Sequence, residues 1–178
     1  MLRVMICAFM AAARLAELGW SRRNIASSDT TEEGGWSHAT FPLILAIHTL
    51  DIGGTLFLGD RRARQRWLLP LLLVQPLRLW TLASLGRRWN ARGVVAADME
   101  VETGGPYAYI RHPNYAVVIV ELFCLPAAFG LKRLALLLSA ANALLLAGRI
   151  RDEEALLRQL PGYRDHFEHL PRLIPGLF

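Results

Sequence analysis

The chain has 178 residues, of which 53% are hydrophobic, and a formal net charge of +5. Soluble domains hold about 45–50% apolar residues, and here the excess is gathered in four blocks, which excludes an evenly patterned soluble domain. The arginines flank these blocks and do not line one polar face, so the charge does not indicate binding to nucleic acid. Cys7 and Cys124 both lie inside apolar blocks, which supports neither a disulfide framework nor a zinc site.

The apolar blocks predict membrane-spanning helices in chain order. They cover residues 4–19, 39–58, 67–85 and 115–150. The last block is too long for one span, and Gly130–Arg133 divides it into a helical hairpin. A helix needs about 20 residues to cross a bilayer, so the short stretch 134–148 would depend on the basic residues at its ends reaching the interface.

These elements predict an all-α fold, an integral membrane helical bundle with about five transmembrane helices. The whole chain, residues 1–178, would form a single domain. Residues 1–85 would supply three membrane helices, and residues 86–178 would supply a polar hinge, the hairpin and a C-terminal helix that completes a binding pocket.

The most informative polar segment is GGPYAYIRHPNY at residues 104–115. It contains two prolines, three tyrosines and an Arg-His pair, directly before an apolar run. This placement predicts a site that binds a polar small molecule at the boundary between water and lipid. The alternative is an interfacial anchor, because Tyr and Arg collect at the headgroup level of membrane proteins anyway.

A second charged segment begins at Arg149, where the last membrane helix ends. The helix would continue through the acidic triplet 152–154, so that Arg149 and Glu153 share one face. With five spans, this tail and the loop 86–112 lie on the same side of the membrane and can form one site. The distribution of Arg and Lys favours the cytoplasm for that side, although the run Arg61–Arg66 opposes it. A solvated charged helix is the alternative.

Together, these segments resemble the isoprenylcysteine carboxyl methyltransferase family. The motifs are GPYxxxRHPxY at 105–115, RIxxEE at 149–154, Gly-Tyr at 162–163 and RxIP at 172–175. Members are integral membrane enzymes that transfer a methyl group from S-adenosylmethionine. The resemblance implies an active site on the cytoplasmic side of a bacterial inner membrane, with a two-walled cofactor pocket. One wall would comprise Gly105, Tyr107, Arg111, His112, Pro113 and Tyr115, and the other Arg149, Glu153, Glu154 and Tyr163. The chain departs from the family at His166-Phe167, where a tyrosine is common.

The first half is similar to one bacterial branch of this family, whose members O-methylate long-chain alkylpyrones and alkylresorcinols made by type III polyketide synthases. The similar segments are residues 14–18, 21–24, 48–50, 77–80 and 85–90. The branch implies a lipophilic acceptor held among membrane lipid, with such a synthase as pathway neighbour. Methylation of prenylated cysteine or of another membrane lipid is the first alternative. A non-enzymatic membrane scaffold or small transporter is the second.

Ionisable residues inside the spans are expensive in lipid and are therefore candidates for function. The pairs Arg14–Glu17 and His48–Asp51 are three residues apart and would satisfy each other. Metal binding by His48, Asp51 and Glu121, or by His166 and His169, has no supporting motif, and no metal is expected.

Arg78 differs from these pairs because it has no partner at helical spacing. We therefore expect it to contact an anionic oxygen of the acceptor, while Glu121 faces the reaction centre or braces Arg78. The catalytic candidates are Arg78, Glu121 and His48, and the expected acceptor contacts are Arg78, Trp80, Trp89 and Asn90.

Overall fold

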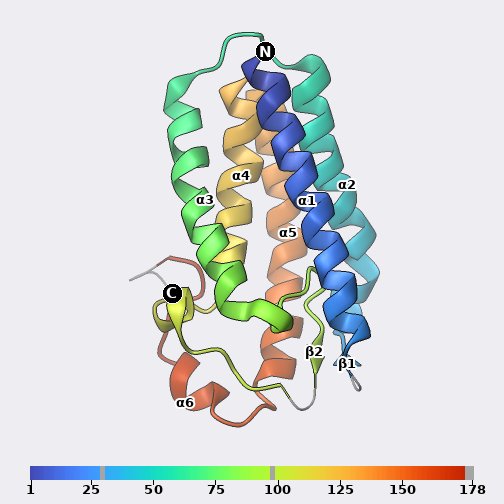
Figure 1. Cartoon of the computed structure of the whole chain (residues 1–178), viewed down its shortest axis with the longest axis vertical. Coiled ribbons are helices and arrows are strands. Elements are labelled where there is room, and N and C mark those ends of the chain that lie inside the picture. Colours follow the sequence, from blue (N-terminus) through green and yellow to red (C-terminus); the bar gives the residue numbers. More distant parts are fainter. Residues whose placement is uncertain (29–30, 97–98, 175–178) are drawn as a thin grey trace.

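Long helices that run side by side form the body of the molecule (Figure 1). The structure, a computed structural model, describes residues 1–28, 31–96 and 99–174, so that Pro175 of the RxIP motif lies outside the described residues. The bundle consists of α1 (Leu2–Ala26), α2 (Gly35–Leu58), α3 (Gln65–Leu85), α4 (Pro113–Ala128) and α5 (Lys132–Leu157). This confirms the prediction of a mostly helical bundle.

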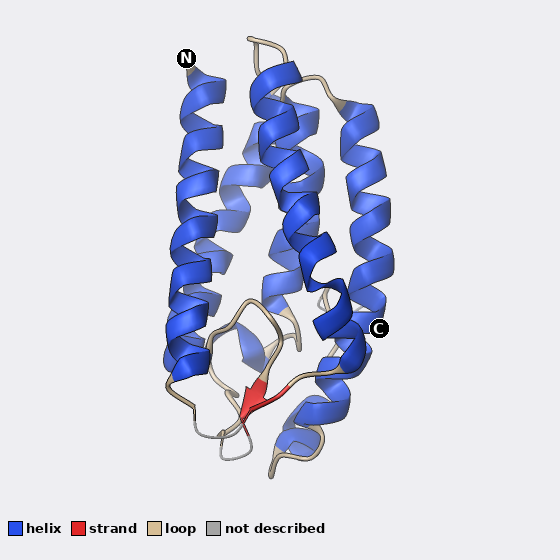
Figure 2. Cartoon of the chain, turned by 90° about the vertical axis from the view of Figure 1, so that its right-hand side faces the viewer, coloured by secondary structure: helices blue, strands red, loops and turns tan. Residues whose placement is uncertain are grey.

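Short elements gather at one end of the bundle, which we call the polar end (Figures 1 and 2). They are the two-stranded antiparallel pair β1 (Thr31–Glu32) and β2 (Val95–Ala96), the 3-10 helices η1 (Gly86–Arg88) and η2 (Gly105–Ala108), and α6 (Tyr163–Phe167). The loop between α3 and α4 and the tail after α5 therefore meet, as the sequence predicted.

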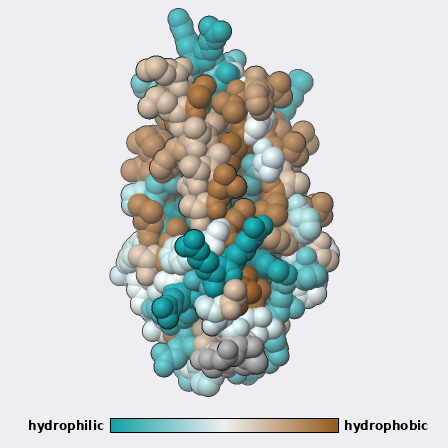
Figure 3. Space-filling view, turned by 45° about the vertical axis from the view of Figure 1, so that its right-hand side comes forward, coloured by the Kyte–Doolittle hydropathy of each residue, from teal (hydrophilic) through white to brown (hydrophobic). Residues whose placement is uncertain are grey.

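Apolar side chains cover the outside of the bundle as well as its core. Phe9, Leu73 and Leu144 are more than 60% exposed, and Figure 3 shows hydrophobic residues over the upper part of one face, with hydrophilic residues at the polar end. Such a surface suits lipid, because large contiguous apolar patches are rare on soluble monomers.

Within the part of the chain that the structure describes, three helical segments are long and apolar enough to cross a membrane: Gly35–Leu58, Gln65–Arg88 and Lys132–Leu157. Helix α4 is apolar but shorter, with 16 residues. Length and composition therefore support an integral membrane protein with three clear spans, and α1 and α4 complete the bundle beside them. Helix α5 has 26 residues and continues through the acidic triplet, as the sequence predicted.

The end opposite the polar end is closed by a tight hairpin between α4 and α5. Gly130 has a φ of +89°, and a Cβ there would lie 2.3 Å from the Asp60 carboxylate, so only glycine fits. The amides of Asp60 and Arg64 donate to the carbonyls of Phe129 and Ala128 at 2.7 and 2.8 Å. These bonds tie the loop between α2 and α3 to the hairpin. Phe129 then packs in a buried cluster with Met10, Leu71, Cys124, Leu125 and Ala128.

Candidate functional site

A cavity of about 480 Å³ begins at the polar end and extends between the helices. The hinge before α4 and the end of α5 both contribute to its wall, together with α6. Seven residues expected to contact a cofactor line it: Tyr107, Arg111, His112, Tyr115, Arg149, Glu153 and Tyr163. The expected acceptor contacts Arg78, Trp89 and Asn90 line the same cavity, as does His48.

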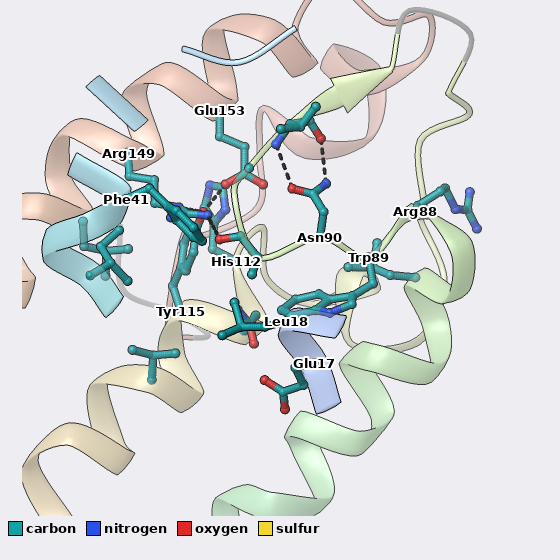
Figure 4. A pocket seen from close by; sticks show the side chains of 18 of the residues that line it. Glu17, Leu18, Phe41, Arg88, Trp89, Asn90, His112, Tyr115, Arg149 and Glu153 are labelled. Atoms are coloured by element: carbon teal, nitrogen blue, oxygen red, sulfur yellow. Dashed lines mark hydrogen bonds between the residues drawn. The ribbon is translucent and has the colours of Figure 1, made fainter. Parts of the chain in front are cut away.

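Arg149 and Glu153 are joined through the hydroxyl group of Tyr115 (Figure 4). Arg149 Nε donates to the Tyr115 hydroxyl at 2.9 Å, and that hydroxyl donates to Glu153. A second guanidinium nitrogen of Arg149 donates to the carbonyl of Ala91, and the guanidinium lies 5.7 Å from the Tyr115 ring centre. The ring of His112 stacks on Tyr115 at 5.2 Å. The linked side chains hold one wall of the cavity to the loop after α3.

Glu154 is placed differently from the other residues that we expected to contact the cofactor. Its carboxylate is 1% exposed and accepts two bonds from Arg172 at 2.8 Å and one from Arg158 at 3.0 Å. His112 Nε2 lies 3.3 Å from the same carboxylate, and Arg111 Nη1 lies 3.6 Å from it. Because the described cavity lining does not include Glu154, its position is that of a junction between the tail and the hinge.

The hinge motif also contains residues that shape the backbone. Gly105 has a φ of +58°, and a Cβ there would lie 2.2 Å from Ser84 Oγ, so the close approach of the hinge to α3 requires glycine. Pro113 begins α4, where its missing N–H is not needed. Trp80 is 48% exposed and lies against Tyr109, with ring centres 6.5 Å apart. We expected Gly105 and Pro113 to contact the cofactor and Trp80 to contact the acceptor. None of the three is among the described residues that line the cavity.

Three residues that line this cavity each have a buried polar atom with no hydrogen-bond partner among the described residues: Trp89 Nε1, Asn114 Oδ1 and the Tyr163 hydroxyl oxygen. Buried polar atoms are nearly always paired, so three such atoms in one cavity indicate a polar ligand. Burial, reinforced by the charge of Glu154, raises the pKa of Tyr163 to about 12. Its hydroxyl is therefore a donor at physiological pH.

The amide of Asn90 is already occupied, although it lines the cavity. Its Nδ2 donates to the carbonyl of Val94 at 2.7 Å, and its Oδ1 accepts from the amide of Val94 at 2.8 Å. These bonds fold the loop after η1 into the cavity wall (Figure 4). Asn24 Nδ2, donating to the carbonyl of Trp89 at 2.7 Å, fixes the same loop to α1.

Arg78 belongs to a buried ion network, which corrects the expectation that it is unpaired. It donates through Nε to Glu17 at 2.7 Å and lies 3.3 Å from Glu121. Arg14 contacts the same two carboxylates at 2.5 and 2.6 Å, and Gln75 donates to Glu121 at 3.0 Å. Two cations and two carboxylates thus balance one another in the bundle interior.

The structure also tests what the sequence predicted for the other buried ionisable residues. Glu121 braces Arg78 and is absent from the described cavity lining, whereas Arg14, Glu17 and Arg78 are part of it. The expected ion pair of Arg14 with Glu17 is confirmed. The pairing of His48 with Asp51 is wrong, because Asp51 Oδ1 has no partner among the described residues.

Sequence reasoning missed several residues of the cavity. Asn114 lies inside the hinge motif, and its short amide side chain at the start of a membrane helix was the available signal. Glu17 was recognised only as the partner of Arg14, because its contact with Arg78 joins α1 to α3. Phe41 also lines the cavity, and nothing in its local sequence distinguishes it from a core aromatic residue. Phe167 lines the cavity too, at the position where the sequence departs from the family.

The chain is similar to several known proteins. It is 33% identical over 163 residues to the uncharacterized protein YpbQ of Bacillus subtilis strain 168. That alignment covers 87% of this chain and 96% of YpbQ. It is 32% identical over 124 residues to the nickel-cobalt-cadmium resistance protein NccN of Alcaligenes xylosoxydans xylosoxydans. It is 29% identical over 125 residues to the cobalt-zinc-cadmium resistance protein CzcN of Cupriavidus metallidurans. The alignments cover 68% and 69% of this chain, and 58% of the length of NccN and of CzcN.

A family model agrees with the motifs around the cavity. It describes the isoprenylcysteine carboxyl methyltransferase (ICMT) family and matches residues 67–159, which is more than half of the chain. The matched region starts in α3 and contains the hinge, α4 and all of α5. From the family match and the similarity to YpbQ along nearly its whole length, we conclude that the chain belongs to the isoprenylcysteine carboxyl methyltransferase family of membrane methyltransferases.

Proposed function

We propose that the protein transfers a methyl group from S-adenosylmethionine to a lipophilic acceptor, and that this reaction is the O-methylation of a long-chain alkylpyrone or alkylresorcinol. The observation that carries the proposal is the cavity itself. Its polar half is lined by three residues that each have an unpaired hydrogen-bonding atom, and its other half lies between apolar helices. Such a cavity suits a polar cofactor next to an acceptor that is dissolved in lipid. The proposed location is a bacterial inner membrane, with the polar end in the cytoplasm.

The residues at the polar end fit the cofactor. Trp89 and Tyr163 offer free donors and Asn114 a free acceptor, while Glu153 brings a carboxylate that suits hydroxyl or amino groups. The stacked rings of His112 and Tyr115 offer a flat surface. Bound S-adenosylmethionine supplies a methyl group on a positively charged sulfur. The chain's own work is to align the acceptor oxygen with that methyl group and to exclude water.

The buried network is the proposed binding site for the acceptor's oxygen. Arg78 and Arg14 line the cavity with their charge balanced by carboxylates, so an anionic oxygen would share these cations with Glu17. A hydroxypyrone is largely ionised near neutral pH and needs no base. A resorcinol must lose a proton, and His48 in the same cavity is the proposed acceptor of that proton.

Methylation assays with the protein purified in detergent test the proposal. We expect binding of S-adenosylmethionine by calorimetry and methylation of long-chain alkylpyrones or alkylresorcinols. Ready methylation of a farnesylated cysteine analogue, with no turnover of either proposed acceptor, would contradict the acceptor class and leave the family unaffected. Absence of cofactor binding to folded protein would contradict methyl transfer itself.

Arg78 offers a sharper test of the acceptor site. We expect Arg78→Ala to abolish methylation of a long-chain alkylpyrone while affinity for the demethylated cofactor stays within a few fold. Arg78→Lys should keep part of the activity, because the charge remains but the paired geometry of the guanidinium is lost. If Arg78→Ala retains full activity, the network is structural only.

A further inference from the structure

The cavity continues between α1 and α2 as a channel that passes Arg14 and His48 before it reaches an apolar far end. On α2 its lining residues recur about one turn apart, from Phe41 through Leu45 to Gly53, and on α1 they extend from Leu18 to Ala11. The rise along α2 from Phe41 to Gly53 is about 18 Å. A cofactor bound in the polar half of the cavity would leave the rest of this channel empty.

Glycine at position 53 keeps the far end of the channel open. A Cβ added there would meet no described atom within 4 Å, although Gly53 is part of the cavity lining. At the neighbouring Gly54, a Cβ would lie 2.8 Å from the side chain of Leu134, so that glycine is needed for helix packing. Packing does not require glycine at position 53. Its lack of a side chain instead leaves space inside the channel.

The far end is closed, but one side of the channel is open. Ile52 lines the channel and also packs against the buried cluster around Phe129, which blocks further extension. Leu15 and Thr49 line it too and yet are exposed, Leu15 by 69%. Leu15 lies on α1 and Thr49 on α2, so the channel opens sideways between these two helices.

We propose that this channel holds the alkyl chain of the methyl acceptor and that Gly53 determines how long a chain fits. This inference rests on the proposed function. An unbranched alkyl chain is the favoured occupant because the far end is lined by Ala11, Ile52 and Gly53, whereas the charged residues Arg14 and Arg78 lie nearer the polar end. The polar headgroup of the acceptor then faces the cofactor site, and its chain points toward Gly53.

The test is the chain-length preference of Gly53→Leu, with Gly19→Leu as the matched control. Gly19 is also a helical glycine whose added Cβ would meet no described atom within 4 Å, but it is outside the described cavity lining. A series of 4-hydroxy-2-pyrones with alkyl chains from methyl to long saturated chains is assayed with each protein. Binding of the demethylated cofactor checks that each protein is folded.

We expect kcat/KM of the wild type to rise with chain length, by up to about fourfold for each methylene that is buried. Gly53→Leu should match the wild type on short chains and lose this rise on long chains, whereas Gly19→Leu should keep it. Parallel profiles for Gly53→Leu and the wild type would overturn the inference. No turnover of any pyrone by the wild type would overturn the proposed acceptor instead.

A second measurement does not need turnover. An alkyl probe with a photoreactive group at the end of its chain should label peptides that contain Ala11 or Gly53 in the wild type. Gly53→Leu should lose this labelling and Gly19→Leu should keep it. Labelling spread over the outer faces of the helices, unchanged in Gly53→Leu, would overturn the inference whatever the identity of the acceptor.

Discussion

At the scale of single residues, the unpaired atoms in the cavity distinguish ligand binding from structural support. Tyr163 is 2% exposed, and its hydroxyl has no partner among the described residues, so the folded protein without ligand gains nothing from it. We expect Tyr163→Phe to leave the melting temperature unchanged or slightly higher. The same change should weaken cofactor binding by about 0.5–1.5 kcal/mol, the net contribution of one hydrogen bond.

Because the pKa of Tyr163 is about 12, the group stays protonated well above neutral pH. The affinity difference between Tyr163→Phe and the wild type should therefore be constant between pH 7 and 9, as measured by calorimetry. A lowered melting temperature with unchanged cofactor affinity would show that the hydroxyl has a structural partner.

Two adjacent carboxylates should behave in opposite ways. Glu154 is buried and bonded to Arg172 and Arg158, so Glu154→Gln should lower the free energy of unfolding by about 1.5–3 kcal/mol, the range for a hydrogen bond to a charged group. Glu153 lines the cavity, so Glu153→Gln should mainly weaken cofactor binding. Thermal unfolding and calorimetry on both variants test the contrast. Equal losses of affinity without loss of stability would place Glu154 in the binding site as well.

At the scale of elements, the sequence predicted the helices better than their contacts. The apolar blocks located α2, α3 and the hairpin of α4 and α5, because hydrophobic length is local information. Arg78 and Trp80 were assigned to one site, yet two residues apart on a helix they point about 200° from each other. The structure buries Arg78 and exposes Trp80 accordingly. The contact of Arg78 with Glu17 joins two helices, and no spacing within one helix could reveal it.

The hinge offers a prediction at this scale. Residue 105 has a positive φ, which side chains rarely adopt, and a Cβ there would occupy the position of Ser84 Oγ. Gly105→Ala should therefore displace the hinge from α3 and reduce both stability and cofactor affinity. Gly104→Ala is the control, because the Cβ there would meet only the movable end of Glu102, at 2.9 Å. Thermal unfolding of the two variants tests this. Equal stability would show that the backbone adapts at the hinge.

At the scale of the whole molecule, the polar end and the hairpin end differ in chemistry. The polar end carries the cavity mouth and the tail, and the opposite end carries the α2–α3 loop with its run of arginines and the tip of the α4–α5 hairpin (Figure 1). Cys7 and Cys124 are both buried, so single introduced cysteines can report which end faces which compartment with little background.

We expect the polar end to face the cytoplasm, because the proposed cofactor is made there. Gln159→Cys places an exposed thiol after α5, and Arg62→Cys places one in the α2–α3 loop. In intact cells an impermeant thiol reagent should label Arg62→Cys and spare Gln159→Cys, and lysis should make Gln159→Cys reactive. The reverse pattern would place the cavity mouth outside the cell and contradict the proposed cofactor supply. Labelling of both Arg62→Cys and Gln159→Cys in intact cells would show that the two positions lie on the same side of the membrane. An even number of spans would then separate them.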